Sequence, residues 1–288
     1  MSINGILVVN KEKGLTSRAV VNQVSKILNT KKVGHTGTLD PMATGVMVLC
    51  VGTSLKLVEL LMNHDKEYIA TVKLGIETDT LDITGQILKR EIVPEITKND
   101  IKKALKNFCG KIKQEVPRYS AIKVNGRKLY EYARAGIDVP LPIHEIEVSK
   151  MELLGDIVDN SFQIRCSVSK GTYIRSLVRD IGYALGTVAV MSDLQRTRVG
   201  DFLLENSYTV AEIERGKYQL LTPQEVLKIP CVIVDKILEA KISNGCVLDP
   251  FFSEDMVMIL NSSHKLLAIY CKSGEGKVKP YRMFLENS

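Results

Sequence analysis

The chain has 288 residues, of which 45% are hydrophobic and 25% charged, and it carries a net charge of +6. This composition is typical of a folded globular protein and excludes a disordered polypeptide. It contains no apolar run long enough to span a bilayer and no signal-peptide pattern at its start, so we expect a cytoplasmic protein without a membrane partner.

The first elements along the chain alternate between strand and helix patterns. Residues 6–9 predict an apolar strand, and residues 16–29 predict a helix behind a Thr/Ser cap. The segment 31–45, rich in Gly and Thr, predicts a polar loop that leads into an apolar strand at 46–52. A second helix is expected at 54–63.

A strand pattern follows, in which Tyr68, Ala70, Val72 and Leu74 alternate with polar positions as in a half-buried strand. Beyond the basic segment described next, residues 161–171 again alternate. The following helix runs over 174–186 and ends at a glycine. Without a strict βαβ rhythm, the order favours an α+β fold with a mixed sheet flanked by helices.

The positive charge is concentrated between Lys98 and Arg134, where eleven basic and three acidic residues give a net +8. Residues 97–113 have helical periodicity, and a solvated helix face would explain their lysines as well as a binding surface would. Further on, basic residues interleave with tyrosines in RYSAIKVNGRKLYEYARAG. This mixture suits phosphate contact and base stacking, and it favours a nucleic-acid partner.

Composition changes near residues 222–230, where TPQEVLKIP contains two prolines. We predict a domain boundary there. Short strands in the remaining segment, CVIVD, MVMIL and LLAIYC, indicate a small β-rich module packed against the larger domain.

Cysteines and cofactor motifs exclude several chemistries. The six cysteines form no CxxC pair and no cluster at metal-ligand spacing, so we expect buried free thiols and no metal. The motifs for ATP and dinucleotides are also absent, and we expect no cofactor. The cysteines are Cys50, Cys109, Cys166, Cys231, Cys246 and Cys271.

An acidic residue in the glycine-rich loop is the remaining candidate for chemistry. In GHTGTLDP, Gly34 and Gly37 permit unusual backbone conformations and Pro41 fixes the chain after Asp40. Such a loop would hold one carboxylate rigidly. Asp before Pro is also a common turn pair, so local chemistry alone leaves a structural role for Asp40 open.

The segment VGHTGTLDPMATGVMVLCVGTSLKL resembles the signature of the bacterial tRNA pseudouridine synthase B family. The resemblance extends in the same order to KEYIATVKLGIETDTLDITGQI, to RYSAIKVNGRKLYEYARAG and to VSKGTYIRSLVRDIGYALG, and covers about residues 4–210. It implies an enzyme that isomerises the T-loop uridine of tRNA, at position 55, by flipping the base out and without a cofactor.

The resemblance also implies roles for individual residues. Asp40 corresponds to the family's nucleophile, Arg175 to its cationic partner and Tyr68 to the tyrosine that stacks on the target base. Tyr173 would enter the same pocket if residues 173–175 are extended, because alternate side chains of a strand share a face.

Three further roles follow from the same resemblance. Leu194 aligns with a leucine that packs on the base, and His35 with a histidine near the flipped nucleotide. Asp79 and Asp82 belong to a family motif, and we assign them to loop and turn structure with a network role near Arg175.

The resemblance divides the chain into a catalytic domain at 1–225, with a mostly antiparallel sheet of the pseudouridine synthase type, and a reduced PUA-like RNA-binding domain at 226–288. Within the first, an RNA-gripping thumb lies at about 115–140, and Lys123, Arg127 and Lys128 are its candidate phosphate ligands. We expect a monomer that binds the tRNA T stem-loop without an obligate protein partner.

Two other interpretations share some of these features. The archaeal and eukaryotic guide-RNA-dependent pseudouridine synthase has a similar loop, but this chain lacks its lysine-rich tails and fuller PUA domain. A non-catalytic RNA-binding protein or tRNA chaperone would need the basic thumb, but it would not need Asp40.

Overall fold

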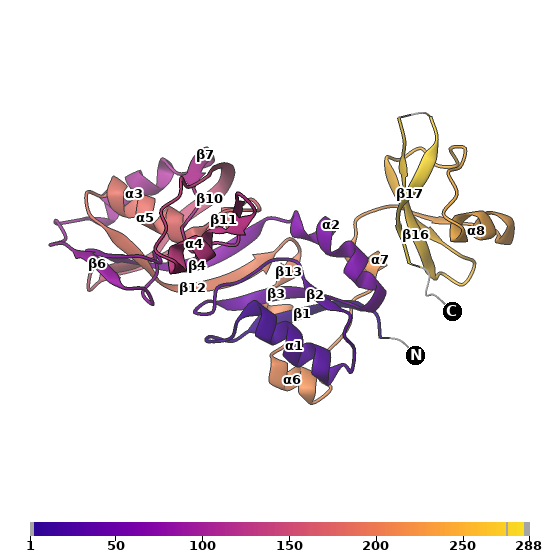
Figure 1. Ribbon diagram of the computed structural model, residues 1–288, viewed down its shortest axis with the longest axis horizontal. Coiled ribbons are helices and arrows are strands. Elements are labelled where there is room, and N and C mark those ends of the chain that lie inside the picture. The colour runs from indigo at the N-terminus through magenta and orange to yellow at the C-terminus, as the bar shows by residue number, and fades with distance from the viewer. Residues whose placement is uncertain (1–2, 275, 285–288) are drawn as a thin grey trace.

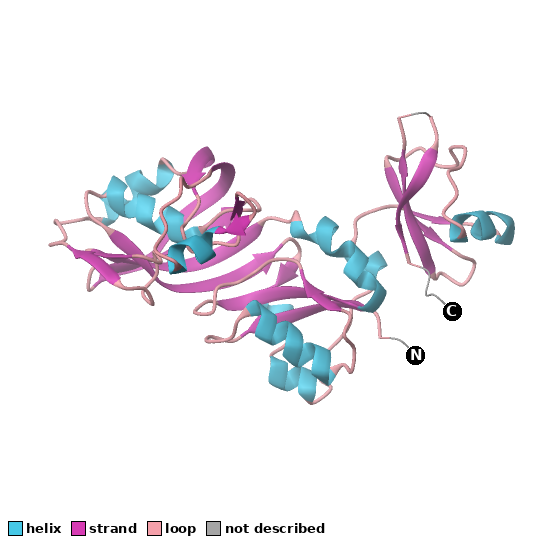
Figure 2. Ribbon diagram, in the orientation of Figure 1, coloured by secondary structure: helices cyan, strands magenta, loops and turns pink. Residues whose placement is uncertain are grey.

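The computed structural model describes residues 3–274 and 276–284, and nine strands of these residues form one mixed sheet (Figures 1 and 2). Its main path runs through β1 (Gly5–Lys11), β3 (Thr44–Val51), β12 (Ala189–Val199), β4 (Lys66–Leu74), β11 (Ser161–Val168), β10 (Ile143–Val158) and β7 (Gly110–Glu115). Two short strands, β2 (Val33–His35) and β13 (Phe202–Leu203), pair with β3 and β12. Among these pairings only that of β12 with β3 is parallel, which confirms the mixed, mostly antiparallel sheet.

Side-chain alternation explains how the sheet builds its core. In β4 every second residue is buried, as predicted, and the buried set packs with helices α3 (Lys98–Lys106) and α5 (Ile174–Ala184). At the other end of the sheet, alternate residues of β1 and β3 pack on α1 (Ser17–Ile27) and α6 (Val210–Glu214). Figure 1 shows these two helix pairs at separate ends of the sheet.

The expected helices form close to their predicted bounds. Helix α1 begins after Thr16, whose side chain accepts a hydrogen bond from the backbone N–H of Ala19 at 3.0 Å. The second helix starts as a 3₁₀ turn, η1 (Gly52–Leu57), and continues as α2 (Val58–Met62). Helix α5 ends before Gly186, which has a φ of +77°.

The predicted helix at 97–113 is wrong in its second half. Helix α3 ends at Lys106, and Gly110 has a φ of +98° at the start of strand β7. This strand pairs with β10, where Lys111 lies opposite Glu147 and Lys113 opposite Glu145. Pairing at a sheet edge therefore overrides helical periodicity, and two lysines of the basic tract have carboxylates across the strand.

The C-terminal segment forms a separate sheet with the strand order β14 (Cys231–Ile233), β15 (Met256–Leu260), β16 (Leu266–Lys272) and β17 (Val278–Met283). The expected β-rich module is confirmed. Helix α8 (Lys236–Ser243), which Asp235 caps, was not predicted. Helix α7 (Pro223–Val226) lies where we predict the domain boundary, which stays a prediction.

The two sheets share a hydrophobic cluster. Ile6 and Val8 of β1 and Leu57 of η1 pack in one cluster with Met258 and Ile269 of the small sheet. Beside this cluster the ammonium of Lys56 donates to the carbonyl oxygen of Met283 at 2.7 Å, and Arg282 forms an ion pair with Glu59. The small sheet is therefore packed on the large one.

The prediction of buried thiols is correct for only two of the six cysteines. Burial raises the pKa of Cys50 and Cys166 to about 12. Cys109, in the turn after α3, and Cys231, on edge strand β14, are exposed, whereas the remaining two are half-buried. All six thiols are free. None of the helices in the described residues is long and apolar enough to cross a membrane.

Candidate active site

Asp40 lies in the loop between β2 and β3, and this loop is held by side chains from three other elements. Ser17 of α1 accepts from the backbone N–H of Leu39 at 2.8 Å and donates to its carbonyl at 3.0 Å. The buried ammonium of Lys11, at the end of β1, donates to the carbonyl oxygens of Pro41 at 3.2 Å and Ala43 at 2.6 Å. Backbone groups on both sides of Asp40 are thus fixed.

Arg196 of β12 holds the same loop from the other side. Its guanidinium, 2% exposed, donates to the carbonyls of Gly37 at 3.3 Å, Thr38 at 3.2 Å and Val46 at 2.6 Å. Sequence reasoning missed both Lys11 and Arg196. The available signals were a lysine ending an apolar strand and an arginine two residues from Leu194, on the same face of a strand.

The carboxylate of Asp40 is paired with the guanidinium of Arg175. The Nε atom of Arg175 lies 2.9 Å from Oδ2, and one terminal nitrogen donates to Oδ1 at 3.4 Å. The Arg175 side chain is 8% exposed and that of Asp40 is 33% exposed. A two-point contact fixes the direction of the carboxylate. The Asp40 side chain stays partly accessible from the pocket, whereas that of Arg175 is covered.

Arg175 also contacts two other segments. Its guanidinium donates to the carbonyl of Thr80 at 3.0 Å and to that of Tyr119 at 3.1 Å. The premise that residues 173–175 are extended is wrong, because Tyr173 is the N-cap of α5 and Arg175 lies in its first turn. Both side chains nevertheless line one pocket, because the chain changes direction at the helix start.

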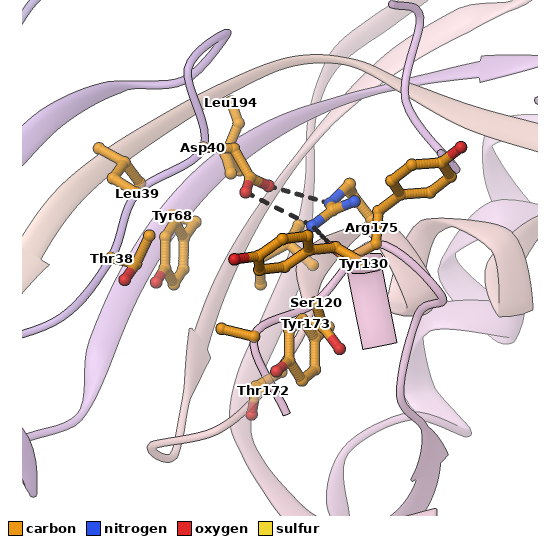
Figure 3. Close-up of a pocket in the computed structure, with 13 residues that line it drawn as sticks. Thr38, Leu39, Asp40, Tyr68, Ser120, Tyr130, Thr172, Tyr173, Arg175 and Leu194 are labelled. Carbon is orange, nitrogen blue, oxygen red and sulfur yellow. Dashed lines mark hydrogen bonds and ion pairs between the residues drawn. The ribbon is translucent and has the colours of Figure 1, made fainter. Parts of the chain in front are cut away.

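This pocket has a volume of about 380 Å³ (Figure 3). It brings together five residues predicted from the sequence, which are Asp40, Tyr68, Tyr173, Arg175 and Leu194. Tyr68 and Leu194, 8% and 4% exposed, come from neighbouring strands of the large sheet. The pocket therefore has one carboxylate with a matched cation and walls of aromatic and aliphatic groups.

The predicted thumb contributes tyrosines to the pocket, and its three predicted lysine and arginine ligands lie outside it. Tyr119 and Tyr130, from either side of the β8 (Lys123–Val124) and β9 (Arg127–Lys128) hairpin, line the wall with Ser120 and Ala121. Tyr130 belongs to α4 (Leu129–Arg134). Lys123, Arg127 and Lys128 do not line the pocket, and their role in RNA binding stays a prediction.

The tyrosine at the start of α5 is held by its backbone. Gln114, 2% exposed on β7, accepts from the N–H of Tyr173 at 2.8 Å and donates to its carbonyl at 3.1 Å. Burial raises the pKa of Tyr173, so its hydroxyl stays protonated at neutral pH. Sequence reasoning missed Gln114, because this contact joins residues far apart in the chain.

The two aspartates of the ETDTLDITG segment stabilise a turn, as expected. Asp82 accepts from the hydroxyls of Thr80 and Thr84, at 2.9 Å and 2.5 Å. Asp79 accepts from the hydroxyl of Tyr119 at 3.2 Å, which joins this turn to the thumb near Arg175. The segment connects the two strands of a short hairpin, β5 (Ile76–Thr78) and β6 (Ile87–Arg90).

His35 lies at the end of β2, outside the set of residues that line the Asp40 pocket. Burial and the nearby charges of Arg196 and Arg18 lower its pKa, so the ring is neutral at pH 7. Its expected position near a flipped nucleotide stays a prediction. In the described part of the chain, no three His, Cys, Asp or Glu side chains are grouped as metal ligands.

Comparison with known proteins identifies the family. Residues 25–174 match the N-terminal domain of the TruB family of pseudouridylate synthases, and residues 175–228 match the tRNA pseudouridylate synthase B C-terminal domain. The chain is 42% identical over 286 residues to the tRNA pseudouridine synthase B of Caldanaerobacter subterraneus subsp. tengcongensis, covering 99% of this chain and 100% of the relative. It is 39% identical over 306 residues to the enzyme of that name from Bacillus subtilis, with 99% of each covered.

A solved structure supports the same assignment. The chain is similar to a protein in the crystal structure of a Cbf5-Nop10-Gar1 complex, with a TM-score of 0.72, 27% identity, and 98% of this chain and 85% of the other covered. The resemblance read from the glycine-rich loop is thus confirmed over the full chain. The protein belongs to the TruB family of pseudouridylate synthases and is an isomerase.

Proposed function

We propose that this enzyme converts the T-loop uridine of tRNA, at position 55, to pseudouridine, with Asp40 as the nucleophile. The observation that carries the proposal is the two-point pair of Asp40 with Arg175, in a pocket that Tyr68 and Leu194 also line. The curated relatives named tRNA pseudouridine synthase B support tRNA as the substrate.

The reaction needs an ionised carboxylate that points at the atom it attacks. The Asp40 oxygen attacks either C6 of the uracil or C1′ of the ribose, and the bond between N1 and C1′ breaks. The base then turns, C5 bonds to C1′, the proton leaves C5, N1 gains a proton, and the carboxylate is released. Arg175 supports this role because a fixed, charge-assisted contact at two points holds the carboxylate in one orientation.

The target base has to leave its stack before it can reach Asp40. A flipped base is held by stacking between aromatic and apolar side chains, and Tyr68 and Leu194 have that character. The thumb tyrosines Tyr119 and Tyr130 add aromatic surface. Bases that leave the stack in an RNA loop are recognised by stacking on aromatic side chains and by hydrogen bonds to their edges.

The test uses an unmodified T-arm hairpin and purified enzyme without an added cofactor. Pseudouridine is mapped by carbodiimide labelling and primer extension for wild type, for Asp40→Asn and for Asp201→Asn. Asp201 is an exposed aspartate in the turn between β12 and β13, paired with Lys228 and outside the Asp40 pocket, so its replacement is a matched control.

We expect a stop at the T-loop uridine with wild type and with Asp201→Asn, and none with Asp40→Asn. RNA binding without a stop in any protein would favour an RNA-binding or chaperone function in place of the proposed reaction. A stop with Asp40→Asn equal to that of wild type would show that another group is the nucleophile.

A further inference from the structure

A second cavity, which we call the basic groove, adjoins the pocket of Asp40. It has a volume of about 900 Å³. The groove and the pocket share four lining residues, which are Thr38, Tyr68, Thr172 and Tyr173. The two cavities therefore lie side by side along these four side chains.

Three cations line the basic groove without a carboxylate partner. They are Lys66 of β4, Lys170 of the loop before α5, and Arg196 of β12. Within the described residues, no Asp or Glu forms an ion pair with any of the three. The two glutamates of the groove lie beside other cations, since Glu59 pairs with Arg282 and Glu145 lies opposite Lys113.

The three cations also act on one another. Lys66 is 8% exposed, and its pKa falls to about 8, first through burial and then through the charge of Arg196. The charge of Asp65 opposes this fall, and that of Lys170 adds to it. Lys66 and Arg196 are both buried, and buried like charges that form no ion pair raise the free energy of the empty site. An anion bound in the groove lowers that free energy, so the groove is suited to a negatively charged ligand.

The three cations differ in how many of their N–H groups are already used in hydrogen bonds within the protein. The ammonium of Lys66 donates to the carbonyls of Met62 at 2.9 Å and His64 at 2.6 Å, which leaves one of its three N–H groups. Among the described residues, the exposed ammonium of Lys170 donates only to the side chain of Asn63, at 2.7 Å. Arg196 uses three of its five N–H groups on the carbonyls of Gly37, Thr38 and Val46, and it contributes charge.

We propose that the basic groove binds a phosphodiester that links the target uridine to its neighbour, with Lys170 and the remaining N–H of Lys66 as ligands and Arg196 as a source of positive potential. The inference rests on the proposed function, because the nucleotide in the pocket brings the phosphate to the groove. The phosphate also draws the RNA strand against the residues shared by both cavities.

The test neutralises one phosphate at a time. T-arm hairpins carry a single methylphosphonate at each linkage around the target uridine, and their Kd values are measured with Asp40→Asn to prevent turnover. We expect one linkage at which the substitution weakens binding about tenfold, the size of a lost charged hydrogen bond.

Lys170→Gln in the same background identifies the ligand. We expect Lys170→Gln to weaken binding of the unmodified hairpin about tenfold and to cause no further loss when the methylphosphonate is at that one linkage. It should also reduce the slope of log Kd against log salt by about 0.7 to 0.9. Lys150→Gln is the control, because Lys150 is an exposed lysine on β10 outside both cavities. Its effect should be the same at every linkage.

Additive effects of Lys170→Gln at all linkages would overturn the proposal. Lys66→Met is expected to couple to the same linkage, and the exposed Lys170 keeps the test decisive if the buried substitution prevents folding. An assay of the wild-type enzyme on the unmodified hairpin separates the phosphate site from the proposed reaction. If pseudouridine forms but Lys170→Gln and the methylphosphonate act independently, only the phosphate site is rejected. If no pseudouridine forms, the proposed reaction is rejected.

Discussion

At the scale of single residues, Arg175 differs from its neighbour Arg179 on the same helix in what it binds. Arg179, which is half-buried, pairs with Glu115 and Asp180. Arg175 contacts both oxygens of Asp40 and two backbone carbonyls from distant segments. Only a planar guanidinium can serve these acceptors together, since an ammonium is a point charge with a different donor geometry.

We therefore expect Arg175→Lys to lower kcat by at least tenfold, the equivalent of one lost charge-assisted hydrogen bond, with a small change in KM. Arg179→Lys makes the same change one turn along α5 and should leave kcat within about twofold of wild type. Steady-state kinetics on the T-arm hairpin measure both. Equal losses in the two variants would contradict a special role of Arg175.

The sequence predicts the residues that line the pocket better than the residues that position them. Asp40, Tyr68 and Arg175 stand in recognisable motifs, and the structure brings them into one pocket. Lys11 and Gln114 act through contacts with residues 32 and 59 positions away, which no local pattern contains. Their positions follow from strand pairing, which a single sequence does not specify.

At the scale of elements, the parallel pair of β3 and β12 brings two backbones unusually close. Gly45 lies opposite Arg196 with a φ of +108°, and a Cβ atom there would be 2.2 Å from the carbonyl oxygen of Arg196. A side chain would push β12 away from β3. The same movement would pull the Arg196 guanidinium from the carbonyls of the Asp40 loop.

Replacement of this glycine by alanine should therefore cost both stability and activity. We expect Gly45→Ala to lower the free energy of unfolding by more than about 2 kcal/mol. Gly216→Ala is the control, because Gly216 has a φ of +74° but no atom within 4 Å of the added Cβ. It should cost about 1 kcal/mol. Urea unfolding gives both values, and equal losses would mean that backbone strain alone matters.

The alternation of apolar and polar residues predicts those strands of the large sheet that have one buried face. It places the buried residues of β4 correctly because each lies on the face that packs against α3 and α5. It fails at 110–113, where Ile112 continues the helical spacing of α3 although the backbone has already turned at Gly110. Pairing with β10 decides that segment, and periodicity carries no information about a partner strand.

At the scale of the whole molecule, strand β16 packs on two different cores. Ile269, fully buried, belongs to the cluster shared by the two sheets. Leu267, 2% exposed, belongs to the core between the small sheet and α8. Truncating either side chain should destabilise the small sheet by about 2 to 5 kcal/mol.

Only one of the two substitutions should loosen the docking of the sheets. We expect Ile269→Ala to speed hydrogen exchange in α2, on the large sheet's side of the shared cluster, and Leu267→Ala to leave α2 unchanged. Hydrogen exchange followed by mass spectrometry distinguishes these outcomes. Unchanged exchange in α2 for both variants would mean that the two sheets are held mainly by the polar contacts of Lys56 and Arg282.

The position of β12 in the sheet affects how the enzyme can be made on the ribosome. This strand, among the last of the large sheet to be synthesised, lies between β3 and β4, which are both made early. A nascent chain that ends before residue 189 contains Asp40 and Arg175, but its sheet is divided into two parts with no strand to join them. Domains fold as their chains emerge, so the active site is assembled only near the end of translation of this sheet. A truncated product therefore carries Asp40 and Arg175 without the strand that joins the two parts of the sheet.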